Sequence, residues 1–444
     1  MLLRDPVHGL VAFEGRASRV IERLLRTREV QRLRNVRQLG LTSLVFPGAE
    51  HSRFAHSLGA AHVMGRLIAR MRSVQDVLPP EQRLDDEAES DVLAAALLHD
   101  LGHGPFSHLF EEVVPHARRH EAWTLDIVRD SSTDVHQALR SLAGEMPERV
   151  AALMEGRHRL GYLARCISGT LDADRCDYLL RDSHMTGVGY GVYDLDWLLR
   201  ALAFAQLPER VGYPSEWVLA IEGRKGLPPI EGYFLARQFM YQQVYHHKAT
   251  RAAESLISAV FTRIAELVQD GTRTLEIPIA LRNAAIARPV PLGEYLALDD
   301  VQLLSSFRVW ERSPDAALSE LTTSLAHRDL PKTVPLPASN LDGCWDEALR
   351  RAREVVGRHG RRPDLAVRLD VPADVPYEEP LDDSADGVWV VIRHQPIQRL
   401  GGCSFLLGQL RNQRIERPRL IFPAALRAQV LAAVEPVIGG TEMR

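Results

Sequence analysis

The sequence predicts a mainly α-helical protein that ends in a small α+β domain, and two patterns along the chain predict it. From residue 16 to about 330, apolar residues recur at spacings of three and four, the period of an amphipathic helix. Beyond that point, short apolar runs typical of strands alternate with helical segments. The chain has 444 residues, enough for two or more domains. We therefore expect a helical domain over 1–330 and a small α+β domain over 331–444.

The helical part opens with three strongly periodic segments, over 19–39, 53–71 and 91–101. Breaks that contain proline and glycine follow the first segment at 45–52 and the third at 102–108. Because these residues end regular helices, we expect separate helices joined by turns.

The later elements are shorter. The segment 216–223 predicts a strand, in a hairpin inserted into the helical body. The α+β part is expected to contain strands within 365–372, 387–394 and 419–423, and helices over 342–356 and 424–436.

Composition excludes several classes of protein. No apolar run approaches the roughly 18–20 residues that a membrane span needs, and the first residues lack a secretory signal. Four scattered cysteines form no CxxC pair and no disulfide framework, which favours a reducing compartment. We therefore expect a cytoplasmic protein with no membrane partner. The net charge of −4 gives no overall attraction to nucleic acid.

A local basic run at 350–363 leaves two interpretations open. The simpler one is a solvated helix face followed by a turn. The other is an edge that binds phosphate or nucleic acid weakly, since clustered arginines attract phosphates.

The segment LLHDLGHGPFSH, at 97–108, gathers one aspartate and three histidines at the end of an apolar helix. Imidazole and carboxylate groups together are ligands for divalent metals. His99 and Asp100 diverge by about 100° on an ideal helix, so they can still reach one ion that sits beyond the helix end. Upstream, His56 shares a helical face with Arg53. His56 alone would more simply be a core or capping residue, but the combination favours a metal site.

A second carboxylate is expected from the segment LDADRCDYLLRD, at 171–182. Asp174, Tyr178 and Asp182 are spaced four residues apart, which places them in one stripe along a helix. Asp174 alone would be an ordinary surface acid. Together with the upstream histidines, it is a candidate ligand.

The order H…HD…D resembles the signature of metal-dependent HD-domain phosphohydrolases, and longer blocks narrow the resemblance. They resemble the deoxynucleoside triphosphate (dNTP) triphosphohydrolases, a branch that includes bacterial dGTPases and the SAM-and-HD-domain dNTPases. The resemblance runs from residue 5 to about 250, and no SAM domain is expected ahead of it. It implies a helical HD-domain core with its motifs over 50–185. The blocks are DPVHG (5–9), QRLRNVRQLG (31–40), VFPGAEHSRFAHSLG (45–59), HDLGHGPFSH (99–108) and DADRCDYLLRD (172–182).

The resemblance also implies a role for individual residues. The metal ligands would be His56, His99, Asp100 and Asp174, and this donor set suits Mn, Fe, Mg, Co or Ni. The catalytic residues would be His103, His108, Glu111 and His120. The dNTP substrate would contact Gln38, Leu39, Arg53, Arg175, Tyr178, Asp182, Arg237, Tyr241 and Tyr245.

Within the substrate set, the three arginines would hold the triphosphate, while Gln38, Tyr178 and Asp182 would meet the sugar and Leu39 the base. Tyr241 and Tyr245 would line the pocket. Their four-residue spacing is equally typical of an aromatic stripe in the core, and the sequence leaves both interpretations open.

The implied reaction is attack of hydroxide on the α-phosphorus, with release of a deoxynucleoside and inorganic triphosphate. The metal and the arginines would offset the negative charge that repels the nucleophile. His108 is the candidate general acid for the 5′-oxygen, because the reference pKa of histidine lies near working pH. His103, with Glu111 and His120, would position or activate the nucleophile.

The chain departs from the SAM-and-HD enzymes where those read an activating guanine nucleotide. Arg4 and Arg26 stand in place of an amide and an acidic residue, and arginine cannot accept from the N–H edge of guanine. We therefore expect that GTP is not an obligatory activator. Gln31, Arg34, His247 and Lys248 match a region that bridges subunits around a nucleotide, so we expect a homo-oligomer, a dimer or tetramer, that could bind a nucleotide activator between its subunits.

Two alternatives stay open. One is an HD-domain phosphohydrolase with another substrate, such as a nucleoside monophosphate, a cyclic dinucleotide or an alarmone. The other is a nucleic-acid-binding or regulatory protein with a structural metal site, which the basic run at 350–363 supports.

Overall fold

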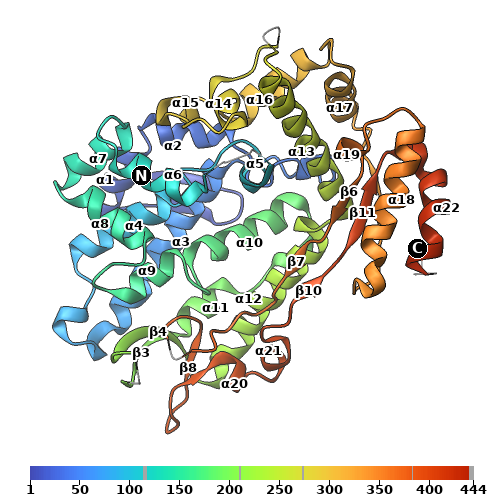
Figure 1. Ribbon diagram of the computed structural model, residues 1–444. Coiled ribbons are helices and arrows are strands. Elements are labelled where there is room, and N and C mark those ends of the chain that lie inside the picture. The colour runs from blue at the N-terminus through green and yellow to red at the C-terminus, as the bar shows by residue number, and fades with distance from the viewer. Residues whose placement is uncertain (114–117, 210–211, 273–274, 383, 440–444) are drawn as a thin grey trace.

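The computed structural model describes residues 1–113, 118–209, 212–272, 275–382 and 384–439. Helices make up 58% of it and strands 11%, so the prediction of a mainly helical fold is confirmed. Figure 1 shows α10 (Ala173–Thr186) crossing the middle of the molecule, with the helices of the N-terminal half on one side of it and the C-terminal helices at the opposite edge.

The chain starts with a β-hairpin and continues into the helical body. The hairpin pairs β1 (Leu2–Asp5) with β2 (Gly9–Ala12) in antiparallel register. The expected segment 19–39 is two helices and a 3₁₀ turn rather than one rod, because the Thr27 hydroxyl donates to the Leu24 carbonyl at the first helix end. The first helices are α1 (Gly15–Leu24), α2 (Arg28–Arg32), α3 (Arg53–Val74) and α4 (Asp86–Leu98).

The rest of the helical body is built from helices of varied length. They are α5 (His108–Val113), α6 (His120–Arg129), α7 (Asp134–Leu142), α8 (Met146–Met154), α9 (Gly161–Ile167), α11 (Leu195–Arg200), α12 (Leu227–Met240), α13 (Lys248–Gln269), α14 (Ile279–Ala285), α15 (Leu292–Leu296), α16 (Asp300–Trp310) and α17 (Ala316–Ala326). Of these helices, α14, α16 and α17 pack with the long helix α13. A π-helical turn, Tyr241–Tyr245, follows α12.

The expected strand at 216–223 is β4 (Glu216–Glu222), which forms a hairpin with β3 (Leu202–Leu207). Two strands from the C-terminal part, β8 (Trp389–Val391) and β9 (Gln398–Arg399), extend this sheet in the order β3-β4-β8-β9. The short helices α20 (Leu400–Cys403) and α21 (Phe405–Leu410) follow β9. The C-terminal segment therefore returns to the helical body.

The remaining C-terminal elements form a small α+β unit with its own core. Its sheet has the order β5-β11-β6, and helices α18 and α22 pack against each other at the edge of the molecule (Figure 1). The elements are β5 (Lys332–Pro335), α18 (Cys344–Arg358), α19 (Pro363–Ala366), β6 (Arg368–Asp370), β7 (Ala373–Asp374), β10 (Ile415–Glu416), β11 (Arg419–Phe422) and α22 (Arg427–Ile438).

The buried side chains show where the two parts meet. The core of the helical body includes Tyr377, Leu400 and Leu407, whereas Val356, Phe422 and other residues of α18, α22 and the three-stranded sheet form a separate core. The predicted division at residue 330 stays a prediction. None of the helices in the described part of the chain combines the length and apolarity that a bilayer crossing needs.

Candidate active site and metal centre

Three of the predicted metal ligands converge at the centre of the helical body. His56 comes from α3, His99 follows the last turn of α4, and Asp174 lies in the first turn of α10. The His56 Nε2 atom lies 3.0 Å from Asp174 Oδ1 and 3.3 Å from His99 Nε2, and the last two atoms are 3.5 Å apart. One divalent ion could contact all three atoms at ligand distances of about 2.0–2.2 Å.

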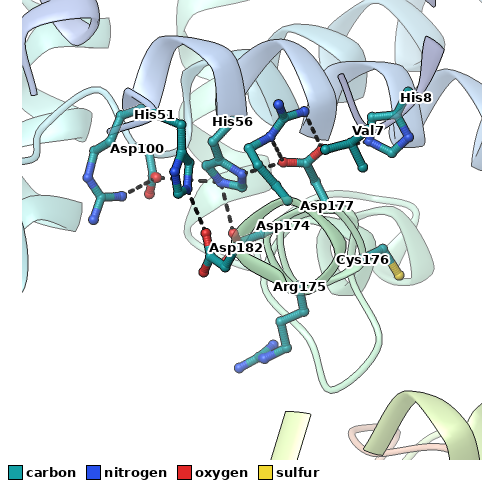
Figure 2. A network of polar contacts seen from close by, with 12 residues as sticks. Val7, His8, His51, His56, Asp100, Asp174, Arg175, Cys176, Asp177 and Asp182 are labelled. Carbon is teal, nitrogen blue, oxygen red and sulfur yellow. Dashed lines mark hydrogen bonds and ion pairs between the residues drawn. The ribbon is translucent and has the colours of Figure 1, made fainter. Parts of the chain in front are cut away.

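The orientation of both imidazoles suits a metal ion. His99 Nδ1 donates to the Ala96 carbonyl at 2.9 Å, and His56 Nδ1 donates to Asp177 at 2.8 Å (Figure 2). With Nδ1 protonated, each Nε2 presents a lone pair towards Asp174, which is the tautomer that a metal requires. Burial lowers the pKa of His56, but its hydrogen bonds to Asp174 and Asp177 outweigh this and raise the pKa to about 10. A metal ion would therefore take the place of a proton on His56 Nε2, because the same carboxylates favour any cation held between the ligands.

The atoms of His56, His99 and Asp174 that face one another form what we call the metal group. Asp100, the fourth predicted ligand, lies between the metal group and the predicted catalytic histidines. Its carboxylate oxygens are 3.6 Å from His56 Nε2 and 3.4 Å from His99 Nε2, and it forms a buried ion pair with Arg53. Burial opposes its ionisation, but Arg53 and the neighbouring imidazoles hold its pKa well below the usual range. On the other side, Asp100 Oδ1 lies 3.3 Å from His103 Nε2.

The four predicted catalytic residues form a second group, which we call the imidazole cluster: His103, His108, Glu111 and His120. The rings of His103 and His120 stack with their centroids 3.7 Å apart, and His108 meets the His103 ring edge-on at 4.8 Å. Glu111 accepts from His120 Nδ1 at 2.8 Å. The structure thus brings all four side chains together, and Asp100 connects them to the metal group.

The turn that carries His103 and His108 is held by a residue distant in sequence. Phe106 and Ser107 have φ of 56° and 60°, a left-handed backbone that is uncommon outside glycine. The buried Asp300 carboxylate accepts the Phe106 N–H at 2.8 Å with one oxygen, and the Arg37 N–H at 3.0 Å with the other. Asp300 therefore ties the catalytic turn to the loop that precedes Gln38 and Leu39.

The predicted sugar-binding residues Tyr178 and Asp182 lie close to the metal group. Both oxygens of the buried Asp182 carboxylate have partners, because His51 Nε2 lies 2.8 Å from one and the Tyr245 hydroxyl donates to the other at 2.8 Å. The Tyr178 ring lies 6.5 Å from His56 and 6.2 Å from Tyr245. Tyr245 therefore takes part in a polar contact at the site rather than in an apolar stripe alone.

Three further residues predicted to contact the substrate are Tyr241, Gln38 and Leu39. Tyr241 packs against Tyr245 with ring centroids 5.0 Å apart, and both side chains are half-buried. The Gln38 amide oxygen is buried without a hydrogen-bond partner in the structure, whereas its neighbour Leu39 is half-buried against the main core. An unpaired amide oxygen beside the catalytic turn suits a ligand hydroxyl.

The three predicted triphosphate arginines are not brought together. Arg53 lies beside Asp100 and donates to Ser107 at 2.9 Å. Arg175 points away from the metal group in Figure 2 and binds Asp172 and the Gly169 carbonyl. Arg237 donates to the carbonyls of Val375 at 2.6 Å and Pro376 at 3.0 Å. Arg175 and Arg237 share a cavity of about 310 Å³, and none of the four predicted metal ligands lines it.

In the region expected to bind an activator nucleotide, Gln31 and Arg34 make contacts within the chain. Gln31 donates to the Leu25 carbonyl at 2.6 Å, and Arg34 donates to Gln31 at 2.8 Å. Arg34 also stacks on the Phe54 ring, 3.6 Å from its centroid. Arg4 and Arg26 are exposed.

The basic run at 350–363 is largely neutralised by neighbouring acids. Arg350 pairs with Glu347 and Glu354, Arg361 with Glu320, and Arg362 with Glu266 and Asp364. These pairs favour the solvated-face interpretation, because a paired guanidinium attracts phosphate less strongly.

Comparisons with known proteins agree with this geometry. The HD-domain family profile matches residues 53–182, a range that holds both groups of the site. The uncharacterized protein YwfO of Bacillus subtilis is 35% identical over 377 residues, covering 85% of this chain and 81% of that protein. The chain belongs to the HD-domain family. Its relatives include YwfO-like proteins and, in Bos taurus, the deoxynucleoside triphosphate triphosphohydrolase SAMHD1, 29% identical over 59% of this chain.

A solved structure shares the fold over nearly the whole chain. A phosphohydrolase from Bacteroides thetaiotaomicron superposes with a TM-score of 0.78 at 26% identity, over 95% of this chain and 99% of that chain. The chain spans about half the length of its SAMHD1 relatives, 47% in Bos taurus and 49% in Dictyostelium discoideum. HD domains bind divalent metals and act as phosphohydrolases, and this HD-domain chain has residues that fit both properties.

Sequence reasoning missed the residues that support the site. Asp177 and Arg181 lie inside the quoted block DADRCDYLLRD at an i, i+4 spacing, which signals a helix ion pair. Asp5 and His8 lie in DPVHG, a block that carried no assigned role. His51 and Asp300 gave no local signal, because only the fold brings them to Asp182 and to the catalytic turn.

Proposed function

We propose that this HD-domain protein is a metal-dependent dNTP triphosphohydrolase, which converts a dNTP and water into a deoxynucleoside and inorganic triphosphate. The observation that carries the proposal is the position of Asp100. It lies between a His–His–Asp group that suits a divalent ion and an imidazole cluster that suits proton transfer. A structural metal site would not need the second group.

The donor set fits a divalent ion held by His56, His99, Asp100 and Asp174. When bound, such an ion supplies charge to offset the phosphates and lowers the pKa of a water molecule. Mn, Fe, Mg, Co and Ni all suit this mixture of imidazole and carboxylate. Arg53, which is buried beside Asp100, adds a fixed positive charge where an α-phosphate would lie.

His108 is the proposed general acid for the 5′-oxygen that leaves. Desolvation of its ring, Arg53 and His120 all lower its pKa, which favours the neutral imidazole in the free protein. A bound polyanion would reverse this effect, because nearby negative charge favours the protonated imidazole. Protonation of His108 would then accompany substrate binding. His103, stacked on His120 and close to Glu111, would orient the attacking water.

The sugar side of the proposal rests on Asp182 and the tyrosines. Each oxygen of the Asp182 carboxylate has one partner and retains a lone pair, so it can also accept from a 3′-hydroxyl. Tyr178, whose ring centroid lies 6.5 Å from that of His56, would pack under C2′ of the sugar and exclude a ribose 2′-hydroxyl.

The test is product analysis in ¹⁸O-labelled water. Metal-loaded protein is incubated with dATP, dCTP, dGTP and TTP, singly and mixed, and products are identified by ³¹P NMR and mass spectrometry. The proposal predicts equimolar deoxynucleoside and triphosphate, with ¹⁸O only in the triphosphate, because attack occurs at the α-phosphorus. Release of monophosphate, pyrophosphate or single phosphates, or ¹⁸O in the nucleoside, would contradict it.

A second candidate is hydrolysis of a nucleotide with fewer phosphates, such as a nucleoside monophosphate. Arg53 contacts the metal group, whereas Arg175 and Arg237 line a cavity apart from it, which favours a substrate with a short phosphate chain. The same assay with deoxynucleoside monophosphates distinguishes the two candidates. Turnover of the monophosphates with none of the dNTPs would favour the second.

A further inference from the structure

The N-terminal hairpin reaches the metal group through a buried chain of charges. Asp5, at the end of β1, accepts from Arg181 at 2.9 Å, and Arg181 donates twice to Asp177, at 2.8 and 2.9 Å. Asp177 in turn accepts from Nδ1 of the metal-ligand His56. Figure 2 shows the end of this chain of charges at the site, where Asp177 meets His56.

The inner part of this chain of charges is fully enclosed, so its geometry is fixed by packing. The side chains of His56, Asp177 and Arg181 have no exposed surface. A methyl group at Gly59 of α3 would overlap both Asp177 and Arg181, so α3 and α10 approach closely at this point. Isolated charges buried in this way are costly unless every one has a partner. Here Asp177 has three partners: Arg181, His56 and His8, the last at 2.7 Å.

The hairpin supplies two of the side chains in this chain of charges, Asp5 and His8. Asp5 binds Arg181 and also accepts the backbone N–H groups of Val7 and His8, both at 2.9 Å. It therefore fixes the turn that carries His8 onto Asp177. His8, held by this turn, and Arg181 occupy the other accepting positions of the Asp177 carboxylate. The position that remains is the one that accepts from His56 Nδ1.

We propose that the hairpin residues Asp5 and His8, acting through Arg181 and Asp177, are positioning residues that hold His56 with Nδ1 protonated and Nε2 free for the metal ion. The physical reason is that the partner of one imidazole nitrogen sets which nitrogen carries the proton and where the ring points. An anionic partner also makes the other nitrogen a stronger ligand. The inference rests on the metal site of the proposed function and not on the choice of substrate.

The experiment is titration of Mn²⁺ into metal-free protein by calorimetry, together with the melting temperature of each variant. Loss of an outer partner of a metal ligand typically weakens metal binding by about 10–100-fold. We expect a loss in that range for Asp177→Asn, and a loss of about tenfold for Asp5→Asn and His8→Asn, which do not touch a metal ligand. If Asp177→Asn fails to fold because Arg181 keeps only Asp5 as a charged partner, the other two variants still provide the test.

The matched control is Asp91→Asn. Asp91 is a buried carboxylate on α4 that pairs with Arg149 at 2.6 Å, and it makes no contact with the metal group. We expect this variant to lower the melting temperature but to leave the Mn²⁺ dissociation constant within about twofold of the wild type, because its charge pair is independent of the site.

A double-mutant cycle between Asp5→Asn and His8→Asn tests whether the two act together. Because both act through Asp177, their effects on Mn²⁺ affinity should not add. Variants that bind Mn²⁺ as tightly as the wild type, or a control variant that loses as much Mn²⁺ affinity as they do, would overturn the inference. Failure of the wild type itself to bind Mn²⁺ would instead overturn the metal site of the proposed function.

Discussion

The metal group and the imidazole cluster share Asp100, but they are built in different ways. The ligands of the metal group sit in or directly after long helices, and each histidine has a fixed partner for its second nitrogen. The imidazole cluster sits on a turn and two short helices, with His108 exposed and His103 Nδ1 lacking a hydrogen-bond partner in the structure. The first group is constrained as a binding site, whereas the second leaves its nitrogens available to exchange protons.

The largest expected effect comes from removing the residue that the two groups share. Asp100→Ala deletes a ligand and leaves Arg53 buried without its partner, so metal retention and turnover should both fall below detection. Metal content by elemental analysis and hydrolysis of each dNTP are measured on the same preparation. Stoichiometric metal with full activity would show that Asp100 is not a ligand.

Next in size is a variant of the imidazole cluster alone. His108→Ala should keep the metal and bind substrate, but lose about 10²–10⁴-fold in kcat, the usual contribution of a general acid. The control is His136→Ala, a half-buried histidine of α7 whose contact is the Val128 carbonyl. If kcat is unchanged and KM rises, His108 binds substrate and does not transfer a proton.

The same comparison explains how much could be predicted from sequence. His56, His99 and Asp174 were assigned as ligands through the family resemblance and the density of ligand-type residues, and the structure brings one ligand atom of each within 3.5 Å of the others. The long helices α3, α4 and α10 and the strand β4 were predictable because their periodicity is local.

What sequence reasoning could not find depends on contacts between distant segments. Asp300 lies 194 residues from the Phe106 N–H that it accepts, and Asp5 lies 176 residues from Arg181. Arg175 and Arg237 were assigned to the triphosphate through resemblance, but the partners that orient them, such as Asp172 and the Val375 carbonyl, cannot be inferred from spacing.

A smaller effect should follow from loosening the catalytic turn. Asp300→Asn replaces one of two accepting oxygens by an amide that cannot accept, so the Phe106 or Arg37 N–H loses its partner, a cost of about 1–3 kcal/mol. We expect a lower melting temperature and a kcat reduced about tenfold, with metal affinity unchanged, because the metal ligands are held separately.

The neighbouring variant Asp299→Asn is the control for that prediction. Asp299 accepts the Gln302 N–H at the start of α16 and makes no contact with the turn. It should change stability slightly and leave kcat unchanged. Equal loss of kcat in both variants would indicate a general effect of stability and would remove the special role of Asp300.

The smallest expected effect concerns activation by nucleotides. Arg4 and Arg26 are exposed, and arginine offers no acceptor for the N–H edge of guanine. We therefore expect that addition of GTP changes the rate of dATP hydrolysis by less than about twofold, the scale of a coupling well below 1 kcal/mol. Activity that requires GTP would contradict this prediction.

Light scattering with and without mixed dNTPs tests the expected homo-oligomer, which should appear as a dimer or tetramer.

The central claim is that the metal group binds the metal ion and the imidazole cluster transfers protons. Anomalous diffraction from crystals soaked in Mn²⁺ tests this claim directly. The account predicts one strong peak about 2.0–2.2 Å from the Nε2 atoms of His56 and His99 and from Asp174, with Asp100 as the fourth ligand. A peak among His103, His108, Glu111 and His120 would contradict this division, because histidines that bind a metal cannot act as the proton donors of the reaction.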